Sequence, residues 1–433
     1  MTYVGQKPAN KPVNQTDIED DAISLAKLAG GTDGNIISYD ASGNPVAIAT
    51  GNDGQVLTST GAGSPPAFEA LVVPTLRPNA NPLIINGDFS IAQRTSSTSS
   101  VSSGSNFVSD RFTFGPATAG TWTISQEAIT SGSPFDNGFR TGFKADNTTA
   151  NGSLSAGSNL QFAQKIEAQD LQLLKYGSSN AEKLTLCFWI KATKTGTNVI
   201  EIFGHDSSRS VSVAYTVSSS NTWEKKTVLI PADTGGTINN DNGTGLEFIW
   251  WLVAGSNFTS GSLQTSWGAN SATARAVGQV NHADSTSNNV HITGIQLEVG
   301  EYSASNLPNF QHESFGDNLK RCMRYYYRQN GESGFASGSA FVQDGTVKSY
   351  QYHTSPVPMR TQVSMSLSNT SGGIIQLDGG ASDNITSIGG VNSGSPFQQY
   401  TLLIITNGSS ITDKCGVSIR INSSHYIEAN AEL

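Results

Sequence analysis

The stretch "PLIINGDFSIAQR", residues 82–94, decides how the rest of the chain is interpreted. An apolar run from Leu83 to Ile85 ends in Asn-Gly-Asp and resumes at Phe89. Asn-Gly and Gly-Asp pairs between apolar residues are typical of a tight turn that follows a strand. Gly, Ala and Asn are common before the stretch, and Ser and Thr are common in the long segment after it. The stretch therefore predicts the first strand of a large β-domain.

Short runs of β-branched and aromatic residues continue to about residue 308. Clusters of Gly, Asn and Ser separate them, and examples are "RFTF", "TWTISQ", "LTLCFWIKA", "LEFIWWLVA" and "NVHITGIQLEV". Short strands at this spacing indicate an antiparallel sandwich. We expect one jelly-roll β-sandwich over residues 81–312, because a sandwich with insertions can reach that length as a single domain.

The segment "FGDNLKRCMRYYYRQNG" interrupts the strand pattern. Its apolar residues recur at i, i+4, i+7, i+8 and i+11, which predicts a short helix with one apolar face. We assign residues 313–330 to this linking helix, which should pack near a trimer axis or against the jelly-roll. The residues expected to make that packing are Phe315, Leu319, Cys322, Met323 and Tyr326.

Strand-like runs return over residues 331–433, for example "QVSMSLS" and "QYTLLIIT". They predict a C-terminal β-sandwich at the tip of the molecule. The expected fold class is thus all-β, with a jelly-roll sandwich and a second β-domain joined by a short helix.

The N-terminal part of the chain predicts an attachment arm and a shaft. Residues 1–30 indicate an extended arm and a short helix. In residues 31–80, "GTDGNIISYDASGNPVAIAT" is followed in register by "GNDGQVLTSTGAGSPPAFEA", and each copy predicts a hairpin-like unit. Two such units bury no core alone, since about three or more are normally required. We therefore expect a homotrimeric β-shaft, with a flexible Gly-rich linker as the alternative.

Composition narrows the class of protein. Charged residues make up 14% of the 433 residues, 45 residues are Gly, and the net charge is −9. With no basic stripe, this charge argues against nucleic acid as a partner, and no apolar run is long enough for membrane insertion. The opening "MTYVGQKPAN" does not resemble a signal peptide. The opening thus indicates a protein made in a cytosol, whereas the composition is typical of extracellular proteins. A virion component, which is made in a cytosol and then released, fits both observations.

The three cysteines are expected to be small buried hydrophobic residues. An odd number, Cys187, Cys322 and Cys415, makes a disulfide framework improbable. Free cysteine is among the most buried residue types in folded proteins.

Several segments together resemble bacteriophage tail fibre proteins of the marine phage type. The opening "MTYVGQKPANKPV" and the repeat are similar to the N-terminal part of such fibres. The series "NPLIINGDF", "ITGIQLEVG" and "NLKRCMRYY" resembles a carbohydrate-binding-module-like jelly-roll found in many phage tail fibres. The resemblance covers nearly the whole chain. It implies a virion protein whose N-terminus docks on a tail protein, either a nozzle or adaptor or a baseplate protein, and whose partner is host cell-surface polysaccharide.

The resemblance also implies a structural calcium ion. In related modules the first and last jelly-roll strands pair and often hold calcium through backbone carbonyls and an acidic side chain. Asp88 and Glu298 are the matching acids in this chain. Calcium prefers carboxylate and carbonyl oxygens in a loose shell. The alternative is that Asp88 caps its own turn.

Sugar binding requires aromatic faces flanked by polar side chains on a rigid surface. Trp223 and Trp267 stand in polar, loop-like surroundings and are the predicted ligand contacts, although Trp223 could also pack structurally at a strand start. Trp189 is expected in the core. Of the adjacent Trp250 and Trp251, one should face the core and the other should point outward or toward a partner chain, because neighbouring strand residues face opposite ways.

Catalysis is the rival to binding. A glycan depolymerase needs two carboxylates in one groove, and the acids here fall in no recognisable catalytic spacing. No zinc motif, no G-x-S-x-G and no phosphate-binding loop occurs in the sequence. The sequence therefore predicts a non-enzymatic, trimeric tail fibre that binds glycans, with a structural connector or adaptor fibre as the alternative.

Overall fold

The structure is a computed structural model of the chain. It describes residues 32–70, 81–330, 336–342, 346–361, 363–368, 373–377, 382–391, 400–411, 416–421 and 425–433, with Asn14, Thr16 and Ile18. The helix and arm expected over residues 1–30, and Cys415, lie outside these residues. The chain divides into two units, Met1–Thr75 and Leu76–Leu433, which are described separately.

Each copy of the N-terminal repeat forms one antiparallel hairpin. Strand β1 (Ile36–Tyr39) pairs with β2 (Pro45–Ile48), and β3 (Gln55–Thr58) pairs with β4 (Ala67–Ala70). Gly34 and Gly54, twenty residues apart, both adopt a positive φ, of 78° and 82°. The left-handed conformation is readily available only to Gly, so the Asp-Gly dipeptide fixes the same turn in both copies.

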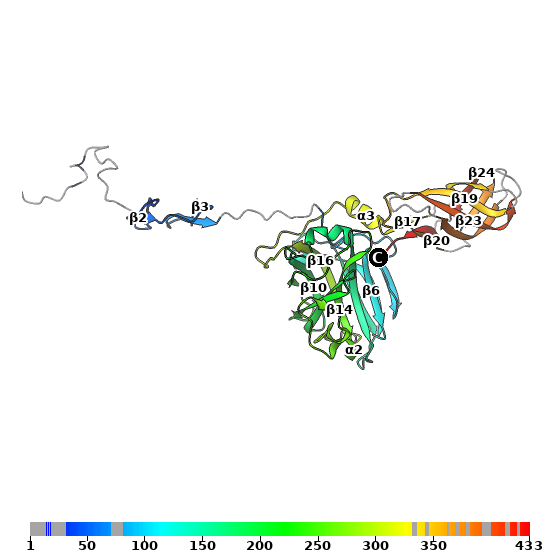
Figure 1. Cartoon of the computed structure of the whole chain (residues 1–433), viewed down its shortest axis with the longest axis horizontal. Helices are drawn as coiled ribbons and strands as arrows, with labels where there is room; N and C mark the ends of the chain where they lie inside the picture. The colour runs from blue at the N-terminus through cyan, green and yellow to red at the C-terminus, as the bar shows by residue number, and fades with distance from the viewer. Residues whose placement is uncertain are drawn as a thin grey trace, which may run out of the picture. The chain divides into compact units, whose positions relative to one another are not determined.

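Two six-stranded antiparallel sheets form the sandwich of the second unit (Figure 1). The first sheet has the order β13 (Glu224–Ile230), β10 (Leu184–Ala192), β16 (Asn289–Val299), β8 (Thr141–Thr149), β7 (Thr121–Ala128) and β5 (Ser97–Val101). The second has the order β15 (Gly268–Ala269), β12 (Arg209–Val217), β11 (Gly196–Gly204), β14 (Thr244–Ala254), β9 (Asn159–Glu167) and β6 (Phe112–Ala117). This arrangement confirms the predicted jelly-roll sandwich.

Aromatic side chains fill the space between the two sheets. The rings of Phe112 and Phe162 stack with centroids 5.1 Å apart, and those of Phe143 and Phe162 stack at 4.5 Å. Trp250 contacts both Phe162 and Phe188 and is fully buried. Offset aromatic pairs of this kind add to the free energy gained by burying the ring surface. The core therefore holds both sheets as a rigid support for their outer faces.

The opening stretch enters this core, but residues 83–85 do not form the regular strand that we predicted. Asn86 and Phe89 adopt positive φ values of 62° and 58°. The Asn86 side-chain amide donates to the carbonyls of Ile91, at 2.9 Å, and Asp110, at 3.0 Å. Only one backbone bond, from Ile295 N–H to Gly87 O at 2.9 Å, joins the stretch to β16. Side chains, rather than a strand ladder, therefore anchor the stretch.

The predicted linking helix is α3 (Phe315–Met323), which covers only the first part of the segment 313–330 that we assigned to it. Ser314 caps it by accepting the N–H of Asp317 at 3.2 Å. Cys322 is fully buried with Ile85 and Ile91 of the opening stretch, and Leu319 packs on the same cluster.

Two of the remaining three residues of the predicted helix face, Phe315 and Met323, differ from this pattern. Phe315 is 63% exposed, so within the chain it makes no such packing, and Met323 is half-buried.

A small three-stranded sheet follows α3. Strand β17 (Tyr326–Asn330) pairs with β25 (Tyr426–Asn430), which also pairs with β20 (Ser364–Leu367). The buried Tyr326 begins β17 and donates its hydroxyl to Glu428 at 2.6 Å. Strand β25 therefore pairs with β17, the strand that directly follows the linking helix.

Six further strands close into a barrel, whereas we expected a C-terminal β-sandwich. Alternating apolar and polar residues occur in both architectures, so the sequence pattern did not separate them. The barrel comprises β18 (Ala336–Val342), β19 (Thr346–Thr354), β23 (Tyr400–Ile411), β22 (Ser382–Val391), β21 (Gly373–Leu377) and β24 (Gly416–Ile421). The all-β fold class is confirmed. Within the described residues, no helix has the length and apolar character required to span a bilayer.

Candidate functional site

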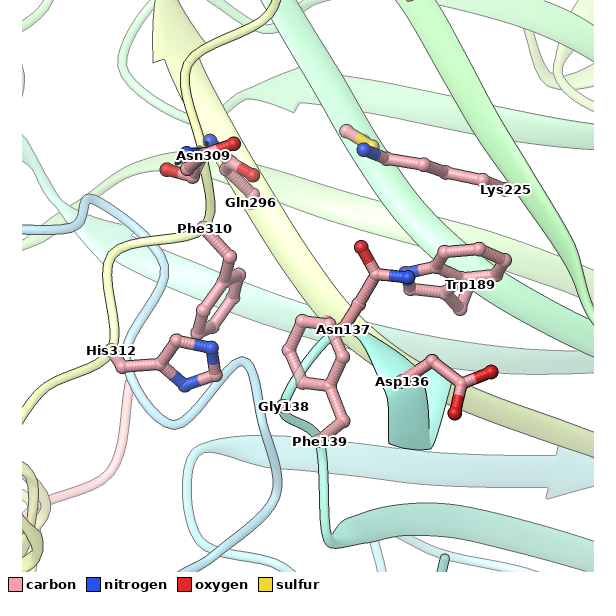
Figure 2. A pocket seen from close by; sticks show the side chains of 12 residues that line it. Asp136, Asn137, Gly138, Phe139, Trp189, Lys225, Gln296, Asn309, Phe310 and His312 are labelled. Carbon is pink, nitrogen blue, oxygen red and sulfur yellow. Dashed lines mark hydrogen bonds between the residues drawn. The ribbon is translucent and has the colours of Figure 1, made fainter. Parts of the chain in front are cut away.

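Two neighbouring hollows lie on the outer face of the first sheet. The larger has a volume of about 490 Å³ and is bounded by β10, β13, β16, residues 309–312 and the α1 loop, which is residues 130–139 around helix α1 (Ser133–Asp136). Figure 2 shows the rings of Phe139, Phe310 and His312 gathered on one side of it, with Trp189 and Lys225 on the other.

Strand alternation places Trp189 in this hollow. Its neighbours Phe188 and Ile190 are fully buried in the core, whereas Trp189 is half-buried on the outer face. Our expectation that Trp189 lies in the core was therefore wrong. The period of two in "CFWIK" defines two faces, but it does not say which of them points inward.

An aromatic cluster forms the opposite wall. The Phe139 and Phe310 ring centroids are 4.8 Å apart at 74°, and the His312 ring lies 4.8 Å from Phe310. A Cβ atom on Gly294 would come within 2.6 Å of the Phe139 ring, and Gly294 has a φ of +62°. Gly at position 294 of β16 therefore lets the Phe139 ring lie directly against the strand.

Buried polar contacts fix the floor. The Gln296 side chain donates to Pro308 O at 2.8 Å and to Glu298 Oε1 at 2.7 Å. The bond to Pro308 ties the segment that carries Phe310 to β16. Burial, as the largest effect, raises the pKa of the Cys187 thiol, which also lines the hollow. This cysteine is therefore held as a neutral thiol.

The rim carries polar side chains. Asp136, Asn137, Asn309 and Lys225 line the hollow and are all exposed. Asp136 ends helix α1 and Asn137 caps it, while Pro134 of the same helix is buried. A half-buried indole surrounded by exposed amide, carboxylate and ammonium groups can bind a sugar ring, because the indole stacks on its C–H surface while the rim groups bond its hydroxyls.

The smaller hollow, of about 250 Å³, adjoins the opposite side of the α1 loop. Lys191 Nζ lies over the Trp223 ring, 5.1 Å from its centroid. The Trp223 ring also meets His291 edge-on at 6.0 Å, and His291 Nδ1 hydrogen-bonds Glu127. The structure therefore brings the predicted Trp223 to a hollow, although its ring already has neighbours.

Trp267, the other predicted contact, lies elsewhere. Its indole N–H donates to Pro231 O at 2.7 Å, and its ring packs edge-on against Tyr176 at 5.7 Å. Pro231 follows the last residue of β13, whereas Trp223 precedes the first residue. The two tryptophans are thus at opposite ends of one strand and line different parts of the surface.

The two predicted calcium ligands each have hydrogen-bond donors. Asp88 Oδ1 accepts from the Ser90 hydroxyl at 3.0 Å and its N–H at 3.3 Å, as a turn cap does. Glu298 is buried and accepts from Gln296. The described residues contain no group of three or more His, Cys, Asp or Glu side chains that could hold a metal. Calcium here would therefore depend chiefly on backbone and amide oxygens, and its binding stays a prediction.

The outer face of the second sheet is covered. As predicted, Trp250 and Trp251 face opposite ways, but both are fully buried because Phe258 packs on Trp251. Trp251 Nε1 donates to Glu201 at 3.0 Å, and Arg275 also bonds this carboxylate, at 2.8 Å. Burial is the largest effect on the pKa of Glu201 and raises it. Around Trp251 this face is therefore held by structural polar contacts.

Sequence reasoning missed Phe139, Phe310 and the outward position of Trp189. The available signal was the pair of Trp–Lys alternations, "WIK" at 189–191 and "WEK" at 223–225. In the sheet these two segments pair, with Trp189 directly opposite Lys225. Such a pairing cannot be known from the sequence without the strand register.

No protein-family model matches the chain, and no curated protein matches it in sequence. Among solved structures, it is similar to the enzymatically active domain of tailspike protein 4 of bacteriophage CBA120, with 14% identity and a TM-score of 0.25. That match covers 44% of this chain and only 19% of the tailspike chain.

Two further structures are also similar. A putative sugar-binding protein from Bacteroides thetaiotaomicron is 13% identical over 51% of this chain and 100% of its own, with a TM-score of 0.26. A family 11 carbohydrate-binding module from Clostridium thermocellum is 9% identical over 47% of this chain and 99% of its own, with a TM-score of 0.23. At such TM-scores these likenesses carry no argument about function.

Proposed function

We propose that the sandwich binds carbohydrate in the larger hollow, with Trp189 as the central contact. One observation carries this proposal: a half-buried indole faces a rigid hollow whose rim bears exposed amide and charged side chains. Because the strand and the packed floor fix the indole, little conformational entropy is lost when a ligand binds.

The same lining favours binding over hydrolysis. Asp136 is the one carboxylate among the twelve residues that line the hollow. Glycoside hydrolysis requires a second carboxylate across the scissile bond. A non-enzymatic role is therefore part of the proposal, with a depolymerase as the less favoured alternative.

We further propose that the chain is a homotrimeric phage tail fibre in the virion, docked on the tail through its N-terminus. The sequence resemblance supports this role, and the hairpins support the trimer. Ile37 is 65% exposed and Tyr39 64% exposed in β1. Further copies of the chain would cover these apolar side chains, which one chain leaves open to water. The alternative is a connector fibre that carries a separate receptor-binding protein.

Binding at one site should be weak and the fibre's adhesion multivalent. A polar, open hollow supports a millimolar affinity, about −4 kcal/mol. Three linked sites on a trimer would raise the avidity by roughly 10²–10⁴ without new contacts.

The experiment compares the purified full chain with its Trp189→Ala variant on a glycan array and on host cells. Trp267→Phe is the matched control, since Trp267 lies outside the hollow and bonds to the backbone. We expect Trp189→Ala, but not Trp267→Phe, to abolish glycan binding. Trp189→Ala should also abolish the ability of the added protein to block phage infection of host cells. Glycan binding that survives in Trp189→Ala would refute the site. Absence of adsorption by the intact trimer would instead favour the connector fibre.

A further inference from the structure

We propose that the smaller hollow is a second subsite that takes an acidic sugar unit, bound by the Lys191 ammonium group, beside a neutral unit on Trp189. The inference rests on the proposed carbohydrate binding and names the chemical class of the ligand: an acidic polysaccharide with carboxylate groups.

The strand register places the two subsites side by side. Trp189 lies opposite Lys225, and one step further along both strands Lys191 lies against Trp223. Residues two apart on a strand are about 6.4–6.8 Å apart, so the two subsites are direct neighbours on the sheet. The α1 loop borders both hollows, with Gly132 in the smaller and Asp136 in the larger. One glycan chain can therefore reach both.

The carboxylates of the two hollows differ in their bonding partners. In the larger hollow, Lys225 and Asp136 carry opposite charges, so a neutral sugar unit suits it. The smaller hollow also holds one cation and one carboxylate, Lys191 and Glu127, but the Glu127 carboxylate is bonded to His291, and the neighbouring Glu224 pairs with Lys226 at 2.5 Å. No carboxylate among the described residues pairs with Lys191, which leaves its ammonium group for an external anion.

Trp223 acts as a positioning residue for that ammonium group. Lys191 Nζ lies over the indole ring, and a cation held over an aromatic face gains electrostatic attraction. A flexible lysine side chain normally loses much rotamer entropy when it binds an anion. Since the indole already restrains Lys191, less of that cost remains when a sugar carboxylate arrives.

The test uses the full chain and an array of neutral oligosaccharides, each paired with a counterpart in which one unit is a uronic acid. The variants are Lys191→Gln and, as a charge-matched control, Lys175→Gln, whose lysine pairs with Glu182 away from both hollows. We expect the parent to bind the acidic counterparts about tenfold more tightly, the factor that corresponds to 1.4 kcal/mol. Lys191→Gln should erase this preference and leave neutral binding unchanged.

Trp223 is tested by the same ratio of affinities. Trp223→Ala should reduce the acidic preference and Trp223→Phe should restore it, an outcome that loss of structure would not produce. Retention of the preference in Lys191→Gln would overturn the inference, and so would an equal loss in Lys175→Gln.

The two proposals fail in different ways. If Trp189→Ala still binds neutral oligosaccharides, the proposed site is refuted. The ratio of acidic to neutral affinity in Lys191→Gln still decides whether the acidic subsite exists. A parent protein that binds no member of the array refutes both.

Discussion

The side-chain amide of Gln164 hydrogen-bonds both backbone groups of Ile85, 79 residues away. Ile85 N–H donates to Gln164 Oε1 at 2.9 Å, and Gln164 Nε2 donates to Ile85 O at 2.8 Å. Gln164 is buried between the core residues Phe162 and Ile166 on the inner face of β9. One glutamine thus replaces the strand partner that Ile85 would otherwise need.

Gln164→Leu should lower the free energy of unfolding by about 2–6 kcal/mol, because it leaves two buried backbone groups without a partner at about 1–3 kcal/mol each. Chemical denaturation of the two proteins measures the difference. Gln161→Leu on the same strand is the control, since Gln161 is only half-buried. Equal stabilities of the parent and Gln164→Leu would show that Ile85 is anchored by other contacts.

The helix face is tested by two substitutions. Leu319→Asp should lower the melting temperature markedly, because it places an unpaired charge on the cluster that contains Cys322 and Ile85. Phe315→Ser should leave the melting temperature of the single chain unchanged, since Phe315 is exposed. If Phe315→Ser instead lowers the stability of the assembled protein, Phe315 contacts another copy, which would favour packing of the helix near a trimer axis. A Leu319→Asp variant that melts like the parent would contradict the assigned face.

Glu432, near the end of the sequence, forms an ion pair with the sandwich. Glu432 pairs with the buried Arg111, whose guanidinium also donates to Lys165 O at 2.7 Å and lies 3.3 Å from the Tyr325 ring centroid. Removing one partner of a buried ion pair costs about 3–5 kcal/mol, so Glu432→Ala should destabilise the sandwich by a large part of that. Glu301→Ala, which breaks an exposed pair with Lys183, should cost at most about 1 kcal/mol. Denaturant titration should separate the two variants, and equal effects would show that Glu432 is dispensable.

The fold was predictable where the pattern is local, and the site was not. The alternation in "FIWWLVA" correctly predicted opposite faces for Trp250 and Trp251. The pattern did not show that Phe258, on the following segment, would cover Trp251. Likewise, the expected strand at residues 83–85 was wrong because the Gln164 side chain bonds the backbone groups that a partner strand would pair with. Trp189 was misplaced because the alternation of β10 does not say which face of the sheet packs against the core. Each of these facts depends on contacts between residues distant in sequence.

The expected calcium ion can be tested by thermal melting after chelation. If Asp88 and Glu298 help to bind calcium, restoring the ion at one hundred times its dissociation constant should stabilise the protein by about 2.7 kcal/mol. Asp88→Asn should abolish this gain, while Asp241→Asn, a turn-capping carboxylate elsewhere in the sandwich, should not. Identical melting with chelator and with calcium would refute the expectation.

Stability should fall in mild acid because of His282. This side chain is fully buried, and its Nε2 lies 2.7 Å from Asn198 Oδ1. Burial, with a smaller effect from Lys194, lowers the pKa of His282 from 6.5 to about 4. The folded state therefore disfavours the proton, and the unfolded chain binds it more readily between these two values. The contribution is fully present above pH 6.5 and is lost as the pH falls toward 4.

Over that interval the loss should reach about 3 kcal/mol, at 1.36 kcal/mol for each unit of pKa difference. Other groups titrate in the same range, so the measurement is the difference between the parent and His282→Gln. We expect the free energy of unfolding of the parent to fall more steeply from pH 6.5 to pH 4 than that of His282→Gln, whatever their stabilities at pH 7. Parallel curves for the two proteins would mean that His282 takes up its proton in the folded state as easily as in water.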